Sequence, residues 1–242
     1  MKAQELYEKQ YKEKKLINKK LTFSFLRKSF KNLDFSREDI ALKLLQLDFQ
    51  EKIENILDLG CGEGNFLFKV GDKFNKLYGI DISPTRIKKA QQFAKKDKSN
   101  KFIFAVGDLN EKVNFPDNMF NIVVCLAVLE HLFDPFFVLK EIHRVLKPGG
   151  ILILEVPNIA YFKYRLQLLF GKLPVTSSPY NWEEIGWDGG HLHYFVKSNL
   201  SKAIENCGFK IIKVSGSGFL ANLRNWYPSL LTGDLIFKAE KS

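Results

Sequence analysis

The feature that most constrains this chain is the stretch at 53–66, which reads Ile-Glu-Asn-Ile-Leu-Asp-Leu-Gly-Cys-Gly-Glu-Gly-Asn-Phe. A run rich in branched apolar residues reaches Asp58 and passes into Gly60, Gly62 and Gly64. Branched apolar residues favour a buried strand, and alternating glycines favour a tight turn. A glycine turn between a strand and a helix brings backbone N–H groups close to a ligand at the helix N-terminus. The stretch therefore predicts a pocket of the nucleotide-binding type at the end of a first strand.

The spacing of the glycines indicates what kind of ligand fits. The dinucleotide fingerprint is G-x-G-x-x-G, with an acidic residue about 20 residues further on. Here the glycines are spaced G-x-G-x-G, and Asp58 lies two residues before the first of them. A carboxylate at the pocket mouth would repel a pyrophosphate, but it would suit an amino group or a sulfonium.

Two further predicted strands also end beside an acidic residue. Residues 78–82 form a strand that ends near Asp81, where the carboxylate can accept hydrogen bonds from both hydroxyls of a ribose. Residues 102–106 form the next strand, and Asp108 follows it in position to accept from an adenine amino group. Three acids at successive strand ends suit a ligand with a cationic end, a ribose and an adenine. That ligand is S-adenosylmethionine.

At this point the chain resembles the class I S-adenosylmethionine-dependent methyltransferases, closely over 53–150 and more loosely to the C-terminus. Any one matching stretch is weak, but all five in order are specific: Leu-Asp-Leu-Gly-Cys-Gly-Glu-Gly at 57–64, Gly-Ile-Asp-Ile-Ser at 79–83, Gly-Asp-Leu at 107–109, Val-Leu-Glu-His-Leu at 128–132 and Leu-Lys-Pro-Gly-Gly at 146–150. The resemblance implies an α/β fold with a doubly wound, Rossmann-like, mostly parallel sheet of seven strands and a C-terminal antiparallel hairpin. The alternation of strands and helices independently indicates parallel strands with right-handed crossovers.

The resemblance also implies which residues bind the cofactor. The glycines admit the cofactor to the backbone, and Asp58 lies near its amino acid end. Residues at the later strand ends hold the ribose, the adenine and the sulfonium. The implied set is Asp58, Gly60, Gly62, Gly64, Asp81, Ile82, Asp108, Leu109 and Leu126.

Length and composition indicate one catalytic domain with extensions. The chain has 242 residues, enough for a full doubly wound core. We predict an N-terminal helical extension at 1–50 and a methyltransferase domain at 51–242, with a lid insertion at 157–195. No apolar run reaches the length of a membrane span, and the N-terminus does not read as a signal peptide. The three cysteines are isolated, so we expect them to be reduced and buried in a cytoplasmic protein.

His131 follows the fourth predicted strand, where the methyl group should lie. A histidine with an ordinary pKa near 6.5 could deprotonate an attacking hydroxyl; alternatively, His131 positions the loop by bonding a backbone group. The stretch also resembles quinone O-methyltransferases, which hold a metal there with an additional glutamate three residues before the Glu-His pair. That position is Ala127 in this chain, so we expect no metal.

The segment at 187–195 reads Trp-Asp-Gly-Gly-His-Leu-His-Tyr-Phe and predicts a substrate mouth. Long ordered loops are usually functional, and we expect substrate contacts from Trp187, His191, His193 and Tyr194. His191 is the second candidate for the catalytic base. The alternative is a tethered lid whose histidines bond the backbone. No cysteine lies nearby, so a zinc site is not expected.

The same region, with Pro-Asn at 157–158 and Gly-Phe at 208–209, resembles a bacterial methyltransferase subgroup associated with cell-surface glycans and other small molecules. We therefore predict transfer of a methyl group to a hydroxyl of a small molecule or glycan precursor, with S-adenosylhomocysteine as the product. A non-catalytic, cofactor-binding partner subunit is one alternative. The resemblance leaves the oligomeric state open.

The formal net charge of +10 raises a second alternative, an RNA methyltransferase. Much of the excess lies in a lysine-rich arm at 9–31, and such an arm is more often a solvated face. The Asn/Asp-Pro-Pro-Tyr motif of base N-methylation is absent, since the equivalent strand end reads Leu-Ala-Val at 126–128. Nucleic acid is therefore the less favoured partner.

Overall fold

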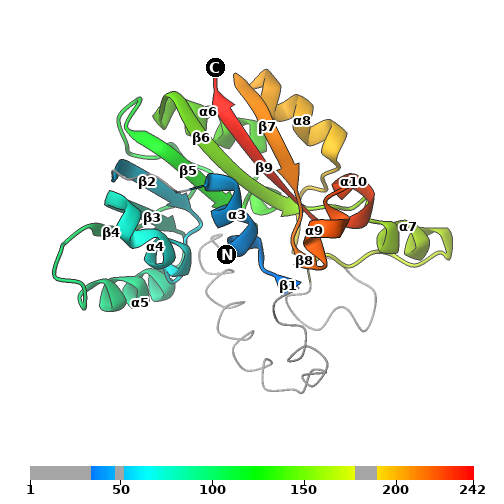
Figure 1. Cartoon of the computed structure of the whole chain (residues 1–242), viewed down its shortest axis with the longest axis horizontal. Helices are drawn as coiled ribbons and strands as arrows, with labels where there is room; N and C mark the ends of the chain where they lie inside the picture. The colour runs from blue at the N-terminus through cyan, green and yellow to red at the C-terminus, as the bar shows by residue number, and fades with distance from the viewer. Residues whose placement is uncertain (1–33, 47–51, 178–189) are drawn as a thin grey trace.

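The computed structural model describes residues 34–46, 52–177 and 190–242, which form a twisted sheet with helices on both faces (Figure 1). The strands are β1 (Asp34–Phe35), β2 (Ile53–Leu59), β3 (Phe74–Asp81), β4 (Phe102–Val106), β5 (Phe120–Leu126), β6 (Leu146–Pro157), β7 (Phe209–Ser215), β8 (Gly218–Phe219) and β9 (Asp234–Lys241). The helices, with the short 3-10 helices η2 and η3, are α3 (Arg37–Leu45), α4 (Asn65–Val70), η2 (Gly71–Lys73), α5 (Pro84–Ala94), η3 (Leu129–His131), α6 (Pro135–Val145), α7 (Phe162–Leu169), α8 (Lys197–Asn206), α9 (Ala221–Arg224) and α10 (Pro228–Leu231).

The main sheet has seven strands in the order β4-β3-β2-β5-β6-β9-β7. The strands from β4 to β6 are parallel, whereas β9 pairs antiparallel with both β6 and β7. The predicted fold class is thereby confirmed. The chain winds outward from β2 to β4 and then returns to β5 on the other side of β2, so the strand order reverses between β2 and β5. In open α/β sheets, ligands bind beyond the carboxyl ends of the strands at such a reversal.

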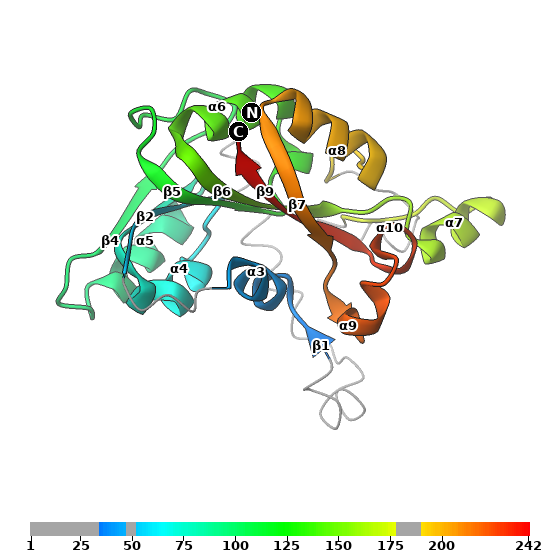
Figure 2. The same cartoon turned by 45° about the horizontal axis from the view of Figure 1, so that its top comes forward.

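The helices bury two separate apolar cores, one against each face of the sheet. Helices α6 and α8 cover one face, and α3, α4 and α5 cover the other (Figure 2). The first core includes Leu139, Ile142 and Leu200, and the second includes Leu44 and Leu67. Strands covered on both faces read as nearly continuous apolar runs, which is why β5 is Phe-Asn-Ile-Val-Val-Cys-Leu.

Local sequence fixes where the central helices begin. The Ser83 hydroxyl accepts a hydrogen bond from the Arg86 N–H at 3.2 Å, and Pro84 is the first residue of α5. At α6, the Asp134 carboxylate accepts from two N–H groups of the first turn, and Pro135 begins the helix. A side-chain cap followed by proline is the favoured helix start. Each helix therefore starts directly after the loop that borders the carboxyl edge of the sheet.

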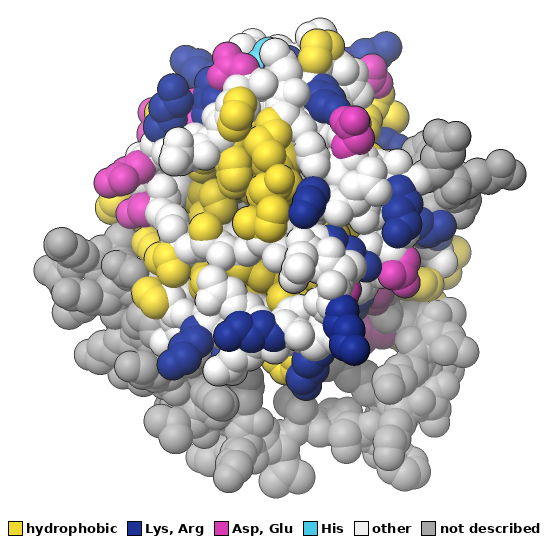
Figure 3. All heavy atoms as spheres, turned by 90° about the vertical axis from the view of Figure 1, so that its left-hand side faces the viewer, with side chains coloured by type: hydrophobic (Ala, Val, Ile, Leu, Met, Phe, Trp, Pro, Cys, Tyr) yellow, Lys and Arg dark blue, Asp and Glu magenta, His cyan; other side chains and the backbone are white. Residues whose placement is uncertain are grey.

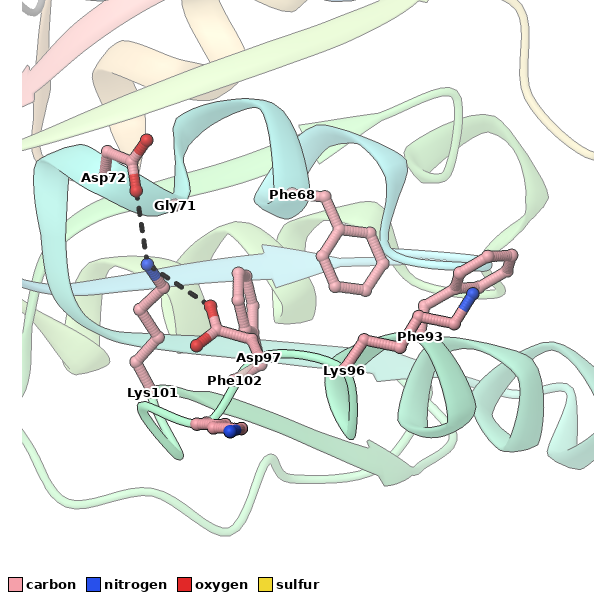
Figure 4. A pocket seen from close by; sticks show the side chains of 9 residues that line it. Phe68, Gly71, Asp72, Phe93, Lys96, Asp97, Lys101 and Phe102 are labelled. Atoms are coloured by element: carbon pink, nitrogen blue, oxygen red, sulfur yellow. Dashed lines mark hydrogen bonds and ion pairs between the residues drawn. The ribbon is translucent and has the colours of Figure 1, made fainter.

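A hollow of about 510 Å³ lies at the opposite edge of the sheet, near the amino ends of β3 and β4. Phe68, Phe93 and Phe102 line it, and Lys101 bridges Asp72 and Asp97 across it at 3.4 Å each (Figure 4). On the same side of the molecule, apolar side chains gather between lysines and arginines (Figure 3). Because the hollow lies at the wrong end of the strands, it does not belong to the site predicted at their carboxyl ends.

The structure also bears on the expected state of the cysteines, on membrane-spanning helices and on the N-terminal extension. Cys61, Cys125 and Cys207 are all buried and free, as predicted. In the described ranges, no helix is both long enough and apolar enough to cross a lipid bilayer. Of the predicted N-terminal extension, the described part contains β1 and α3, and residues 1–33 and 47–51 lie outside it.

Candidate active site

The glycine loop after β2 is held to the end of β3. The Gly60 N–H donates to the Ile80 carbonyl at 2.8 Å, and the Gly62 N–H donates to Asp81 Oδ2 at 2.8 Å. Gly60, Gly62 and Gly64 have φ values of +76°, +57° and +83°. L side chains rarely adopt this conformation. The sequence therefore uses glycine where the backbone must turn back on itself beside the sheet.

Asp81 holds the ends of two loops at once. Its Oδ1 accepts from the Ser83 N–H at 2.9 Å while its Oδ2 accepts from Gly62. Arg86 Nη1 lies 3.6 Å from Oδ2, and Asp81 is only 4% exposed. Each carboxylate oxygen can accept more than one hydrogen bond. The carboxylate is therefore fixed in place and still able to accept from a ribose.

Asp58 is the second buried acid of this edge, 4% exposed at the end of β2. Burial and the nearby charge of Asp81 raise the pKa of its carboxyl well above the ordinary value. A positively charged group of a ligand would offset the cost of ionising this buried carboxyl. S-adenosylmethionine carries an ammonium and a sulfonium, so the residues present fit that cofactor on the chemistry of this buried acid.

The end of β4 completes the predicted cofactor edge. Asp81 pairs with Val106 across β3 and β4, so Asp108 lies just beyond the neighbouring strand. Asp108 Oδ1 accepts from the Asn110 N–H at 2.9 Å, and Leu109 is buried. Ile82 follows Asp81 directly. The structure thus aligns the predicted cofactor residues along one edge, in the order β4, β3, β2.

The last predicted cofactor residue, Leu126, ends β5 on the other side of β2. Ala127 then has φ +56°, a conformation rarely used by non-glycine residues, and its N–H donates to the Glu155 carbonyl at 3.1 Å. This turn brings Val128 against the glycine loop so closely that a Cβ on Gly60 would lie 2.2 Å from Val128 Cγ2. The residues that follow β5 therefore lie directly against the glycine loop.

Three titratable side chains converge just beyond this contact, and we call Glu130, His131 and His191 the acid–imidazole cluster. The Nε2 atoms of His131 and His191 lie 3.9 Å and 3.8 Å from Glu130 Oε1. The two imidazole rings are 4.8 Å apart, centroid to centroid. The structure therefore brings both predicted catalytic histidines together, although they are sixty residues apart in sequence.

Backbone hydrogen bonds fix the geometry of this cluster. The N–H groups of Leu192 and His193 both donate to the Glu130 carbonyl, at 2.8 and 3.1 Å. His131 Nδ1 lies 2.7 Å from the Gly190 carbonyl oxygen. Since a carbonyl only accepts, this Nδ1 carries the hydrogen, and Nε2 of the neutral ring then carries a lone pair. His131 is thus oriented with its basic nitrogen toward Glu130.

The sequence did not identify Glu130 as a site residue. Glu130 is 1% exposed, and within the described chain neither of its carboxylate oxygens has a hydrogen-bond partner. Burial, followed by the nearby charge of Glu155, raises its pKa to about 8. The signal was present in the sequence, because an acid beside a histidine immediately after an apolar strand is an unusual placement for a solvated charge.

The other residues predicted to contact substrate lie outside the acid–imidazole cluster. His193 Nε2 lies 3.3 Å from the Phe133 carbonyl oxygen and so bonds the backbone. Tyr194 is 44% exposed. Trp187 lies outside the described residues. The contacts that these side chains make with a substrate therefore stay predictions.

A second buried acid near the cluster also escaped sequence analysis. Glu155 lies in β6, is 3% exposed, and pairs with Arg37 of α3, whose Nη1 is 3.3 Å from Glu155 Oε2. The pair ties the described part of the N-terminal extension to the central sheet. A single acid within the apolar run Ile-Leu-Ile-Leu-Glu-Val of β6 was the available signal.

Glu155 leads to an expected pH dependence of folding. Burial, opposed by Arg37 and reinforced by Asp234, raises the pKa of its carboxyl from 4.5 to about 7. The folded state therefore holds this proton more tightly than the unfolded state does. Its contribution to stability is full below the unfolded pKa and is lost as the pH rises through about 7. We expect the free energy of unfolding of Glu155→Gln, measured by urea titration, to fall less across this window than that of wild type.

Glu205→Gln, which removes an exposed acid from α8, is the matched control and should follow the wild-type profile. If Glu155→Gln and wild type gave parallel pH profiles, the assignment of this dependence to Glu155 would be wrong.

A protein-family match and two relatives of known name all indicate a methyltransferase. Residues 50–184 match the family of methyltransferase domains. The chain is 26% identical to a Bacillus subtilis protein named as methyltransferase YqeM, over 83% of this chain and 89% of that protein. It is 32% identical to a demethylmenaquinone methyltransferase of Geobacillus stearothermophilus, over 68% and 74% of the two chains.

Among solved structures, an S-adenosylmethionine-dependent methyltransferase of Methanosarcina mazei matches with a TM-score of 0.60 and 26% identity, covering 82% of this chain and 96% of that one. The family match spans more than half of the chain, and the order of strands in the sheet agrees with it. The chain therefore belongs to the methyltransferase domain family and is a class I S-adenosylmethionine-dependent methyltransferase.

Proposed function

We propose that this enzyme transfers a methyl group to a hydroxyl of a small molecule or glycan precursor. The acid–imidazole cluster would bind this acceptor. The observation that carries this proposal is the position of the cluster. Glu130 and His131 follow β5 within a few residues of Val128, which lies against the glycine loop, and His191 joins them from a distant segment. Polar groups able to bind and deprotonate an acceptor thus sit next to the place where the cofactor would lie.

On the cofactor side, the buried acids and the glycine loop would hold S-adenosylmethionine. Bound there, the cofactor supplies a methyl group that is already activated by a positively charged sulfur. The protein then needs mainly to align the acceptor with that methyl group and to exclude water. The residues we propose for binding are Asp58, Gly60, Gly62, Gly64, Asp81, Ile82, Asp108, Leu109 and Leu126.

On the acceptor side, His131 would take the proton. As the acceptor oxygen bonds to the methyl carbon, its proton passes to His131 Nε2. S-adenosylhomocysteine would be the product, with the electron pair of the broken carbon–sulfur bond kept on sulfur. His191 is the second candidate for this role, because its Nε2 faces the same carboxylate.

The surroundings of the cluster suit an acceptor with an apolar body. Phe133, Leu192 and Tyr194 are 70%, 54% and 44% exposed next to the cluster residues in sequence. The Geobacillus relative is named for demethylmenaquinone, which supports a small-molecule acceptor. His193 and Tyr194 would contact that acceptor at the mouth.

The test is methyl transfer from labelled S-adenosylmethionine to a panel of hydroxyl acceptors, covering phenols, sugars and nucleotide sugars. General base catalysis typically contributes about 100- to 10,000-fold, so His131→Gln should lose about that factor in kcat. Its cofactor affinity, measured by calorimetry, should change little, because the two ring nitrogens of His131 face the Gly190 carbonyl and Glu130. Label appearing in RNA in place of every hydroxyl acceptor would contradict the proposal.

A further inference from the structure

The acid–imidazole cluster has the composition of a metal site. Its three ligand atoms, one carboxylate oxygen and two imidazole nitrogens, all lie within 4.8 Å of one another. A buried carboxylate without hydrogen-bond partners is costly, yet within the described chain both oxygens of Glu130 are in that state. A cation between the three groups would satisfy the carboxylate.

The Nδ1 atoms of both imidazoles make the kind of hydrogen bond that the second nitrogen of a metal-bound histidine usually makes. A ligating histidine typically donates its second ring N–H to a carboxylate, a backbone carbonyl or water, which fixes the ring and its tautomer. Here His131 Nδ1 donates to the Gly190 carbonyl at 2.7 Å, and His191 Nδ1 lies 2.8 Å from Thr176 Oγ1. In both rings Nε2 is the nitrogen that faces Glu130.

The segments that carry the ligands are locked together before any ion arrives. The backbone of Glu130 accepts from Leu192 and His193, one and two residues beyond His191. His131 is also held by its own N–H, which donates to the Val128 carbonyl at 2.9 Å. The cost of ordering a binding site is therefore largely met by the fold itself.

We propose that Glu130, His131 and His191 bind one divalent transition-metal ion, most favourably Zn²⁺. Two imidazoles and one carboxylate are a donor set for zinc, iron or cobalt, whereas magnesium and calcium take mainly oxygen ligands. Three protein ligands also leave coordination positions open, as in catalytic zinc sites. The sequence analysis expected no metal at His131 and no zinc site at His191, because it considered the two segments separately, whereas the fold brings them together.

The observed spacing suits a site that contracts onto its ion. Zinc bonds of about 2.0–2.2 Å place tetrahedral ligand atoms about 3.4 Å apart. The separations of 3.8 and 3.9 Å around Glu130 Oε1 need to close by about half an ångström. The third separation is at most 4.8 Å and needs to close by up to about 1.4 Å, which rotations of the two imidazole side chains would supply.

This inference rests on the proposed function for its chemical role. An acceptor hydroxyl bound at an open position of the ion would have a lowered pKa. Its proton would leave to solvent, and the oxygen would keep the electron pair with which it attacks the methyl carbon. The sulfur would retain the electrons of the broken carbon–sulfur bond. The ion would thus take over the role otherwise given to His131 as base.

The test uses the full chain after removal of metal with a chelator. Titration with Co²⁺ should give visible absorption bands of a low-coordinate site, and calorimetry with Zn²⁺ should show one equivalent bound. Loss of a ligand should weaken binding by at least about 10- to 100-fold, the loss typical even for outer-sphere partners. Glu130→Gln and His191→Gln should both show that loss. His143→Gln, which changes a histidine of α6 outside the cluster, should bind like wild type.

Absence of the Co²⁺ bands and of Zn²⁺ binding in wild type would overturn the inference, as would equal binding by Glu130→Gln and wild type. His191→Gln provides the second variant should Glu130→Gln fold poorly. Titration of S-adenosylmethionine on the same samples separates the two proposals. Cofactor binding without metal binding would leave the proposed function intact with His131 as base. Metal binding without cofactor binding would contradict the proposed function alone.

Discussion

Replacing Asp81 with alanine should reduce the affinity for S-adenosylmethionine by about 30- to 1000-fold in a calorimetric titration. The variant would lose the two hydrogen bonds that we propose a ribose donates to this carboxylate, a net loss on the order of 2–4 kcal/mol. It would also release the Gly62 and Ser83 N–H groups, which Asp81 holds at 2.8 and 2.9 Å. The glycine loop would then have to be ordered by the ligand.

Asp97→Ala is the matched control for this experiment. Asp97 Oδ1 accepts from the N–H two residues later, that of Ser99, at 2.8 Å, which repeats the Asp81–Ser83 bond in an exposed loop. It lies beside the hollow at the opposite edge of the sheet. Asp97→Ala should leave cofactor affinity unchanged. Wild-type affinity in Asp81→Ala would show that the cofactor does not bind at this edge.

Gly60→Ala should have the largest effect on stability, about 2–5 kcal/mol, because two costs combine. An L residue in the left-handed region costs about 1–2 kcal/mol, and Gly60 has φ +76°. Its new Cβ would also lie 2.2 Å from Val128 Cγ2, and overpacking typically costs about 1–3 kcal/mol. Urea unfolding would measure the sum.

Gly149→Ala isolates the first of these costs. Gly149 has φ +71°, and a Cβ added there would meet no atom within 4 Å, so its cost should be only about 1–2 kcal/mol. The double variant Gly60→Ala/Val128→Ala should recover part of the loss by removing the collision. Equal destabilisation by Gly60→Ala and Gly149→Ala would show that the loop after β5 does not press against the glycine loop.

The sequence was sufficient to predict the sheet and the placement of three acidic residues at one of its edges, and the reason is geometric. Asp58, Asp81 and Asp108 each lie at or just beyond the end of a strand, and the ends of parallel strands meet at one edge. Local patterns of strand, glycine and acid therefore determine a three-dimensional arrangement. The helix starts at Ser83 and Asp134 were equally local, since a cap and a proline suffice to specify them.

The acid–imidazole cluster could not be predicted as a unit, because its members come from segments that meet only in the fold. Sequence indicated His131 and His191 separately, but the hydrogen bonds of Leu192 and His193 to Glu130 bring them together. The pairing of Arg37 with Glu155 spans 118 positions along the chain. Helix α7 buries none of its residues, although its apolar residues lie at helical spacing.

The backbone attachment of the loop that carries His191 has a consequence for how such enzymes diversify. The bonds from Leu192 and His193 to Glu130 involve only main-chain atoms, and the side chain of Leu192 is more than half exposed. Substitutions at 192–194 can therefore reshape the acceptor side while the loop keeps its position. The residues that we propose for cofactor binding lie at the ends of β2, β3, β4 and β5, outside 192–194, and such substitutions would leave them unchanged. On the proposed assignment of the sites, the acceptor preference of such an enzyme could change by substitution at 192–194 while its affinity for the methyl donor stays the same.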